Sequence, residues 1–295
     1  MHDLTLSMRA VMTARRMGKK FAKRIGGYVD YDLHLYEAIE SLRQWSSKDI
    51  IFDVGANDGR TVSRLMNHLP SPKIYAFEPV TETYRLLVKE TSKLSNVIPM
   101  NLALGTEVGK QIMYLNDQSV LSSLYPEWSD YDKTEEIDIT TVDSMVDKLG
   151  IDSIALLKID AEGHDFDVVK GAENSIRSGS INMIQVEAGF DAPGWRKMPS
   201  LWDFRDYLDS FGYYLHGVYN QCKAPISAVD NDGFADADKL NKNILVFCDA
   251  LFVRHGNPNK SLNQLLGLLP GRENTRQQLH KHDANKLSEK EIEGG

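Results

Sequence analysis

An acid and two glycines follow a short apolar run near residue 50. The stretch IIFDVGANDGRT places Asp53, Gly55, Asn57 and Gly59 directly after the run 50–52. Gly55 allows a sharp turn and lets the backbone approach a ligand, and Gly59 lets a following helix pack closely. The spacing Gly-x-x-x-Gly differs from the Gly-x-Gly-x-x-Gly loop that receives a pyrophosphate at a helix N-terminus. The loop therefore favours a ligand without phosphate groups.

A second acid, Glu78, ends the apolar run KIYAF and lies 25 residues after Asp53. An acid at the end of a second strand can accept hydrogen bonds from both hydroxyls of a ribose. The alternative is that Glu78 only ends the strand and caps the next helix. Taken with the glycine loop, Glu78 indicates an adenosine-type ligand across the ends of two neighbouring strands.

The stretch KIDAEGHD brings together side chains that can transfer a proton. Side chains alternate along a strand, so Lys158, Asp160 and Glu162 are expected on one face. Burying such a group without a function is costly. One carboxylate could take a proton while Lys158 sets its charge. His164 is another candidate base, because imidazole titrates near neutral pH; alternatively it is a solvated residue in the first turn of a helix.

Acceptor contacts are expected after the later strands. Glu187 ends a further apolar run and could accept hydrogen bonds from an acceptor, or it could pair with Lys158. Trp195 lies in the loop 189–202, where its ring could stack on a sugar or anchor the loop on the core. Carboxylates such as Asp160 also suit magnesium. We expect no metal here, because the sequence lacks a second Asp–Asn pair nearby.

Strands and helices must alternate to position these residues. The expected strands are 50–54, 73–79, 96–105, 109–116, 135–141, 152–163, 181–189, 213–220 and 244–254. The expected helices are 30–45, 61–69, 81–94, 164–179 and 201–212. This alternation predicts a mostly parallel sheet covered on both faces. The last two strands are rich in aromatic and branched residues and predict a hairpin-like addition to the sheet.

The two ends of the chain differ from the domain between them. Residues 1–29 predict an amphipathic helix, with seven basic residues and no acid between Arg9 and Arg24. This helix could touch an anionic membrane, but packing against its own or a sister domain is the favoured interpretation. Residues 30–256 are expected to form one domain, and the polar residues 257–295 a largely disordered tail.

Composition limits the function classes. The chain has 295 residues, a net charge of −8 and a pI of about 5.5, so charge argues against nucleic acid as a partner. Two cysteines, Cys222 and Cys248, cannot build a disulfide framework or a cysteine zinc site. Their low number favours a reducing, cytoplasmic setting. No apolar run reaches the length of about 18 residues that a membrane helix requires.

Six motifs occur in a fixed order: FDVGANDGRT, YAFEP, NLALG, TTVDSM, LLKIDAEGHDFDVVKGA and IQVE. This series resembles the FkbM-type methyltransferases, whose members read D-V-G-A-N-x-G, A-F-E-P, N-x-A-L-G, T-x-D and K-I-D-x-E-G. The resemblance spans about residues 50–187, and residues 249–254 resemble the family's last strand. It implies a Rossmann-like class I methyltransferase fold. That fold is a seven-stranded, mostly parallel sheet with a C-terminal antiparallel strand and helices on both faces.

The resemblance also implies a cofactor and a reaction. The cofactor is S-adenosylmethionine (SAM), and the reaction is O-methylation of a sugar, a glycan or another small natural product. The implied SAM-binding residues are Asp53, Gly55, Asn57, Gly59, Glu78, Asn101 and Ala103. Among them, Glu78 would bind the ribose, while Asn101 and Ala103 at the end of the third strand would flank the adenine.

Three points stay open at the level of sequence. The base that takes the acceptor's proton could be Asp160, Glu162 or His164, with Lys158 beside it. The chain could instead be a non-catalytic SAM-binding or scaffold protein. An NAD-dependent oxidoreductase is less favoured, since its tighter glycine loop is missing. The partners expected are a hydroxylated acceptor and, for the protein itself, a second copy of the chain.

Overall fold

A computed structural model describes residues 33–115, 122–124, 133–190, 198–225 and 243–256. The chain divides into two units, Met1–Asn257 and Pro258–Gly295, and all described residues lie in the first. The predicted basic helix at residues 1–29 and the predicted tail at 257–295 lie outside the described residues. None of the described helices is long and apolar enough to cross a membrane.

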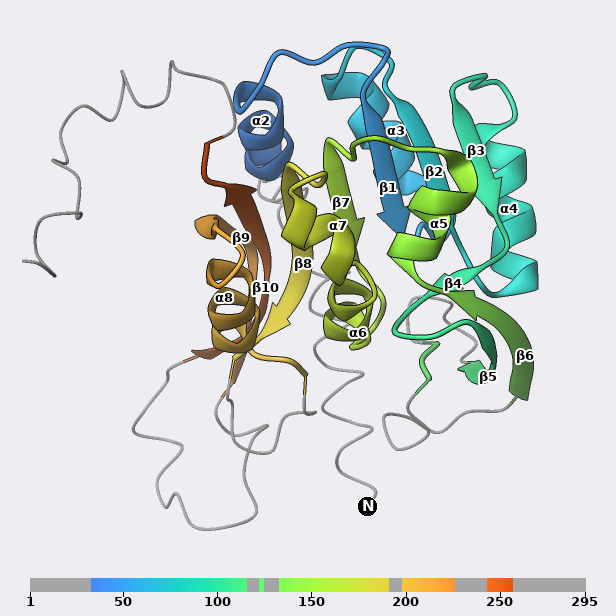
Figure 1. Ribbon diagram of the computed structural model, residues 1–295. Helices are drawn as coiled ribbons and strands as arrows, with labels where there is room; N and C mark the ends of the chain where they lie inside the picture. Colours follow the sequence, from blue (N-terminus) through green and yellow to red (C-terminus); the bar gives the residue numbers. More distant parts are fainter. Residues whose placement is uncertain (1–32, 116–121, 125–132, 191–197, 226–242, 257–295) are drawn as a thin grey trace, which may run out of the picture. The chain divides into compact units, whose positions relative to one another are not determined.

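Seven strands form the main sheet (Figure 1). They are β1 Ile50–Val54, β2 Lys73–Phe77, β3 Val97–Met100, β7 Leu156–Ile159, β8 Met183–Gly189, β9 Tyr213–Pro225 and β10 Asn243–Arg254. Their order is β3-β2-β1-β7-β8-β10-β9, and β10 runs antiparallel to both of its neighbours. The predicted seven-stranded sheet with one antiparallel C-terminal strand is therefore confirmed.

Helices cover both faces of this sheet. They are α2 Leu33–Ser41, α3 Arg60–His68, α4 Thr81–Thr91, α5 Val142–Leu149, α6 Asp165–Lys170, α7 Glu173–Ser178 and α8 Leu201–Asp209. Helices α5 to α8 pack on one face, where Phe52, Leu157 and Ile184 belong to the main hydrophobic core. Strand residues next to these, such as Ile51 and Asp53, point to the opposite face, which α2 and α3 cover.

A second, three-stranded sheet of order β4-β6-β5 contains β4 Ala103–Leu104, β5 Gly109–Leu115 and β6 Lys133–Thr140. The single strand predicted over 96–105 is therefore wrong, because β3 ends at Met100 and β4 joins another sheet. Asn101 explains the break: its Nδ2 donates to the carbonyl oxygens of Glu78 (3.0 Å) and Pro79 (2.7 Å) and turns the chain. Ala103 is buried against Ile139, and its predicted place at the end of the third strand is also wrong.

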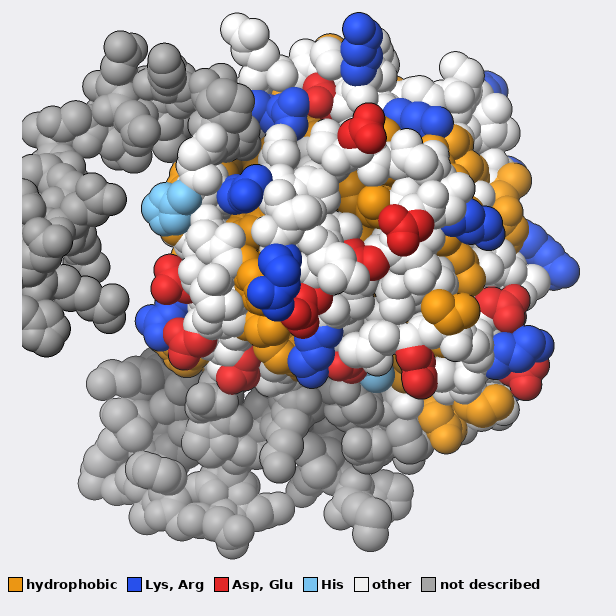
Figure 2. Space-filling model, in the orientation of Figure 1, with side chains coloured by type: hydrophobic (Ala, Val, Ile, Leu, Met, Phe, Trp, Pro, Cys, Tyr) orange, Lys and Arg blue, Asp and Glu red, His pale blue; other side chains and the backbone are white. Residues whose placement is uncertain are grey.

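The helix predicted over 164–179 is two helices, α6 and α7. A Cβ atom on Gly171 would lie 1.9 Å from the carbonyl oxygen of Gly105, so glycine is needed where the two segments meet. Within the described residues, the face drawn in Figure 2 carries acidic and basic side chains interspersed over its surface. That distribution does not form the single-sign field that steers a highly charged partner.

The order of the strands fixes where a ligand can bind. From β1 the chain moves outward through β2 to β3 and then returns to β7 on the other side of β1. Ligands of open α/β sheets bind beyond the carboxyl ends of the strands at such a reversal. A ligand is therefore expected at the loops after β1 and β7, with the end of β2 beside them.

Candidate active site

The glycine loop after β1 lies directly against the end of β7. The backbone N–H groups of Gly55 and Ala56 donate to the carbonyl oxygen of Phe77 at 3.0 and 2.9 Å, and the N–H of Asp160 donates to Val54 at 3.1 Å. Gly55 has a φ of 72°, and a Cβ atom there would lie 2.0 Å from the carbonyl oxygen of Asp160. Glycine is required both for the turn and for this close approach.

The substitution Gly55→Ala is expected to lower the free energy of unfolding by about 2–4 kcal/mol, because left-handed strain and a backbone clash combine. Gly150→Ala is the matched control. Gly150 has a φ of 61° with nothing within 4 Å of its added Cβ, so only about 1–2 kcal/mol is expected there. Urea denaturation of both variants makes the comparison. Equal losses would show that the contact with Asp160 is unimportant.

Glu78 joins the loops after β1 and β2. Its Oε2 accepts from the backbone N–H of Asn57 and its Oε1 from that of Val80, both at 3.0 Å. Asn57 has a φ of 49°, a left-handed conformation that asparagine tolerates. Burial raises the pKa of Glu78 to about 7, although both N–H groups oppose the shift. Each oxygen keeps acceptor capacity, so the carboxylate can also receive two ligand hydroxyls.

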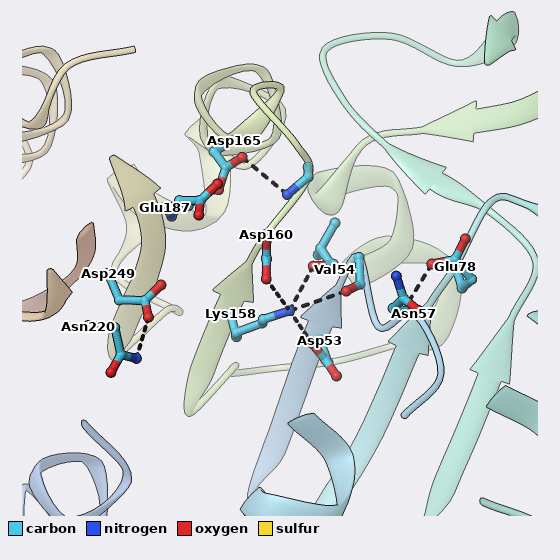
Figure 3. Close-up of polar contacts among 12 residues, drawn as sticks. Asp53, Val54, Asn57, Glu78, Lys158, Asp160, Asp165, Glu187, Asn220 and Asp249 are labelled. Atoms are coloured by element: carbon cyan, nitrogen blue, oxygen red, sulfur yellow. Dashed lines mark hydrogen bonds and ion pairs between the residues drawn. The ribbon is translucent and has the colours of Figure 1, made fainter. Parts of the chain in front are cut away.

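Asp53, Lys158 and Asp160 form a charged group beneath the glycine loop (Figure 3). Asp53 and Lys158 are register partners on β1 and β7, and Lys158 Nζ lies 2.9 Å from Asp53 Oδ1 and 3.9 Å from Asp160 Oδ2. Lys158 Nζ also donates to the carbonyl oxygens of Val54 (3.4 Å) and Gly55 (3.3 Å). Asp53 and Lys158 are buried, whereas the Asp160 side chain is 45% exposed.

Burial alone would lower the pKa of Lys158, but attraction to Asp53 and Asp160 outweighs it and holds this pKa above its usual value. Lys158 is therefore a fixed positive charge. The carboxylates within ion-pair distance of it, among the described residues, are Asp53 and Asp160. The alternative pairing of Lys158 with Glu187 is wrong.

The expected alternation of side chains does not reach Glu162. Strand β7 ends at Ile159, and Glu162 lies in a turn with a φ of 49°. The common face predicted for Lys158, Asp160 and Glu162 is therefore wrong beyond Asp160. His164 precedes α6, and its Nδ1 lies 3.3 Å from Asp167 Oδ2 one turn along that helix. Among the three candidate bases, Asp160 is the one whose carboxylate lies within ion-pair distance of Lys158, and it is 45% exposed.

Asp165 holds the loop after β7 against β8, a role that sequence reasoning missed. Its Oδ2 accepts from the backbone N–H of Ala161 (3.1 Å) and its Oδ1 from that of Glu187 (3.0 Å). The side chain is fully buried. Burial, followed by repulsion from Asp160, raises the pKa of Asp165 to about 7, although both N–H groups oppose the shift. The signal in the sequence was an acid at the start of a helix.

A raised carboxyl pKa makes the folded state bind more protons than the unfolded state. For Asp165 the window runs from the ordinary value of 3.8 to about 7, and stability falls as pH rises through it. Between pH 5.5 and 8 we expect the wild type to lose about 2 kcal/mol from this group. In Asp165→Asn that contribution should vanish, as measured by urea unfolding at both pH values. A constant difference between the two proteins would contradict the assignment.

A second polar group lies further along the sheet. Glu187 on β8 and Asp249 on β10 are register partners, and Asn220 Nδ2 donates to Asp249 Oδ2 at 2.5 Å (Figure 3). Gln185 precedes Glu187 on the same face of β8. Sequence reasoning named Glu187 but missed the other three, although the polar residues in MIQVEAG and FCDALFVR were a visible signal. Trp195 lies outside the described residues.

No three His, Cys, Asp or Glu side chains among the described residues gather in a way that could hold a metal ion. The polar groups at the strand ends are instead carboxylates held by backbone N–H groups, by Lys158 and by Asn220. Such an arrangement can accept hydrogen bonds from hydroxyls and can accept a proton.

The model of the Methyltransferase FkbM domain matches residues 53–215, more than half of the chain. The chain belongs to the FkbM methyltransferase family. The family resemblance predicted from the sequence is confirmed, and with it SAM as the cofactor that the family uses. The match begins at Asp53 and contains the glycine loop, Glu78, Lys158 and Asp160.

A curated relative is the hexuronic acid methyltransferase AglP of Haloferax volcanii, which is 24% identical over 160 residues. The match covers 54% of this chain and 64% of AglP, so the chain spans less than two thirds of that relative. Among solved structures, the 1,6-didemethyltoxoflavin-N1-methyltransferase of Burkholderia thailandensis has a TM-score of 0.41 at 8% identity, covering 85% of this chain and 90% of that one. TYW2 of M. jannaschii, in complex with AdoMet, has a TM-score of 0.35 at 15% identity, covering 77% and 78%.

Proposed function

We propose that this methyltransferase acts on oxygen, transferring the methyl group of SAM to a hydroxyl of a sugar or glycan. The observation that carries the proposal is the set of carboxylates at the strand ends, with Asp160 half exposed beside the glycine loop. Carboxylates accept hydrogen bonds from hydroxyls and can take a hydroxyl proton. The similarity to a hexuronic acid methyltransferase supports a sugar as acceptor.

The residues of the glycine loop fit SAM. Glu78 presents a buried carboxylate that two backbone N–H groups fix in place, and its remaining lone pairs suit the two ribose hydroxyls. Gly55 keeps the loop close to β7, and no described side chain of the loop is a lysine that would hold a phosphate. When bound, SAM supplies a methyl group activated by a positively charged sulfur.

The residues of the chain supply position and a base. Asp160 is proposed to accept the proton of the acceptor hydroxyl on its carboxylate, which raises the nucleophilicity of that oxygen. Lys158 lies 3.9 Å from Asp160 and holds the carboxylate at the end of β7. Lys158 Nζ also lies 2.9 Å from Asp53 Oδ1. Moving the lysine away would leave the buried carboxylate of Asp53 without its ion-pair partner, which is costly.

The proposal is tested with purified protein in two steps. Calorimetry measures binding of SAM and, as a comparison, of NAD. Mass spectrometry then follows S-adenosylhomocysteine and the gain of one methyl group on a panel of methyl hexosides, methyl hexuronides and oligosaccharides. Binding of SAM together with methylation of a sugar hydroxyl is expected. SAM binding without turnover on any acceptor would favour the non-catalytic alternative, and methylation of nitrogen or carbon alone would exclude O-methylation.

A further inference from the structure

One row of residues crosses the sheet from the proposed base to the edge strand β9. The register of β7 with β8 brings Asp160, just beyond the end of β7, to the level of Glu187. Glu187 is the register partner of Asp249 on β10, and Asp249 is the register partner of Tyr219 on β9. Directly paired residues share a face of the sheet, so Tyr219 points to the same face as Glu187 and Asp249. Figure 3 shows the first part of this row, with Glu187 between Asp160 and Asp249.

The side chain of Tyr219 lies back along its own strand. A Cβ atom on Gly217 would lie 2.6 Å from the hydroxyl oxygen of Tyr219 and 2.8 and 2.9 Å from its ring atoms Cζ and Cε2. The ring therefore covers Gly217, two residues earlier on the same face, and a side chain at position 217 would displace it. Tyr219 is partly exposed. Its ring offers a broad apolar surface on which the C–H face of a sugar can pack.

The backbone around Tyr219 is irregular. The pairing of β9 with β10 shifts register on both sides of the segment 217–219. Asn220, the next residue, has a φ of 46°, and its Nδ2 donates to Asp249 Oδ2 at 2.5 Å. Bulges redirect side chains next to active sites, and left-handed residues other than glycine cluster at ligand sites. The irregular backbone, which costs stability, therefore supports a binding role for this part of β9.

The span from Asp160 to Tyr219 bears on the length of the acceptor. Three strand spacings separate β7 from β9 in the order β7-β8-β10-β9. At about 4.8 Å for each spacing, the two backbones are about 14 Å apart. Because the ring of Tyr219 lies along β9, it does not reach across the sheet toward Asp160. A single pyranose ring is much shorter than this span, whereas two or three linked rings cover it.

We propose that Tyr219 binds a sugar ring one or two units away from the ring that is methylated, so that the acceptor is an oligosaccharide rather than a single sugar. This inference rests on the proposed O-methylation of a sugar, with Asp160 as the base, and goes further by naming the residue that binds a second ring. Gly217 and Asn220 are positioning residues. Gly217 leaves room for the ring, and Asn220 ties the backbone beside Tyr219 to Asp249.

The test measures how turnover depends on acceptor length. Methyl glycosides of one, two and three α-1,4-linked glucose units, and of one, two and three α-1,2-linked mannose units, are assayed with the full chain and saturating SAM. Tyr219→Ala removes the ring, Tyr219→Phe keeps it, and Gly217→Ala displaces it while the tyrosine remains. Calorimetry with SAM and thermal melting show that each variant is folded and retains its cofactor site.

Two variants serve as matched controls. Tyr214→Ala removes another partly exposed tyrosine of β9, whose ring centroid lies 4.8 Å from that of His255. Gly109→Ala adds a Cβ atom to a strand glycine that has nothing within 4 Å of the added atom. Both controls change the same residue types as the test variants, but outside the row that leads to Asp160.

In the wild type, the trisaccharide is expected to have a kcat/KM about tenfold or more above that of the monosaccharide. Tyr219→Ala and Gly217→Ala should each raise KM for the trisaccharide about tenfold and that for the monosaccharide much less, because only the longer acceptor reaches the ring. Tyr219→Phe should bring KM back to within about threefold of the wild type. The two controls should keep the wild-type preference for the longer acceptor.

Equal kcat/KM values for one and three units would overturn the inference and leave O-methylation of a sugar standing. An unchanged KM for the trisaccharide in Gly217→Ala and Tyr219→Ala, or in the first alone if the second does not fold, would also overturn it. A lower melting temperature of Tyr219→Ala without a change in the ratio of the two KM values would show that the ring only covers Gly217. Intact SAM binding without turnover of any sugar would overturn both proposals.

Discussion

Replacing Glu78 with glutamine is expected to weaken SAM binding about a hundredfold at pH 8. The carboxylate is buried and already fixed by the N–H groups of Asn57 and Val80, so it is oriented before the ligand arrives. Two ribose hydroxyls donating to an ionised carboxylate are worth about 1.5–3 kcal/mol each, and losing about 2.7 kcal/mol of that total corresponds to two orders of magnitude in Kd. Isothermal calorimetry measures the change. Glu90→Gln, at an exposed position on α4, is the control and should bind as the wild type does.

The affinity of the wild type for SAM should also depend on pH. In the free protein the pKa of Glu78 is about 7, and hydroxyl donors favour the ionised carboxylate. Binding therefore lowers this pKa and releases a proton, so the affinity rises as pH increases from 6 to 8 and levels off above the free pKa. Glu78→Gln should show a flatter profile. Identical pH profiles for the two proteins, or an unchanged Kd in the variant, would remove Glu78 from the ribose site.

The features that were predicted correctly from the sequence are those that depend on local pattern and chain order. The strands β1, β2 and β8 are fully or largely buried, and this burial is why their sequences are runs of mostly apolar residues. Because parallel strands end at the same edge, Asp53, Glu78 and Asp160 had to come near one another once the strand order was known. Gly55 could also be identified from the sequence, because a sharp turn directly after a strand often requires the positive φ that glycine adopts.

The features that were missed or wrong depend on contacts between distant segments. The break between α6 and α7 follows from the approach of Gly105 to Gly171, which local helix propensity does not encode. The end of β3 follows from Asn101 bonding to the loop after β2. The hydrogen bond between Asn220 and Asp249 forms where the pairing of β9 with β10 shifts register. The sequence of neither strand alone predicts that shift.

The alternation of side chains expected over residues 158–162 fails where strand β7 ends. A period of two holds only while the chain remains a strand, and β7 ends one residue before Asp160. Lys158 and Asp160 still approach each other because the latter is the first residue beyond the strand. Glu162 is separated from them by the turn that leads into α6, and the carbonyl oxygen of Glu162 accepts from Ser123 Oγ at 3.1 Å. The geometry therefore divides the three candidate bases that the sequence left equivalent.

Asp160→Asn is expected to lower kcat by about two to four orders of magnitude while leaving the affinity for SAM within a few fold of wild type. Asparagine keeps the shape of the side chain and the backbone contacts of Asp160 with Val54 and Gly55, but it cannot accept the hydroxyl proton. Asp53 and Lys158 form a separate ion pair, so removing the charge of Asp160 leaves that buried pair intact. Single-turnover rates at saturating acceptor, read as S-adenosylhomocysteine formed, measure the chemical step.

Two further substitutions distinguish the candidate bases. Glu162→Gln and His164→Gln are each expected to change kcat only a few fold, because the turn carries Glu162 beyond the end of β7 and His164 contacts Asp167 on α6. Asp152→Asn, at an exposed loop position, controls for loss of an acid from the chain. A wild-type rate for Asp160→Asn together with a large loss for His164→Gln would transfer the role of base to the imidazole. The base would then be the residue that directly precedes α6, and it would act without Lys158 beside it.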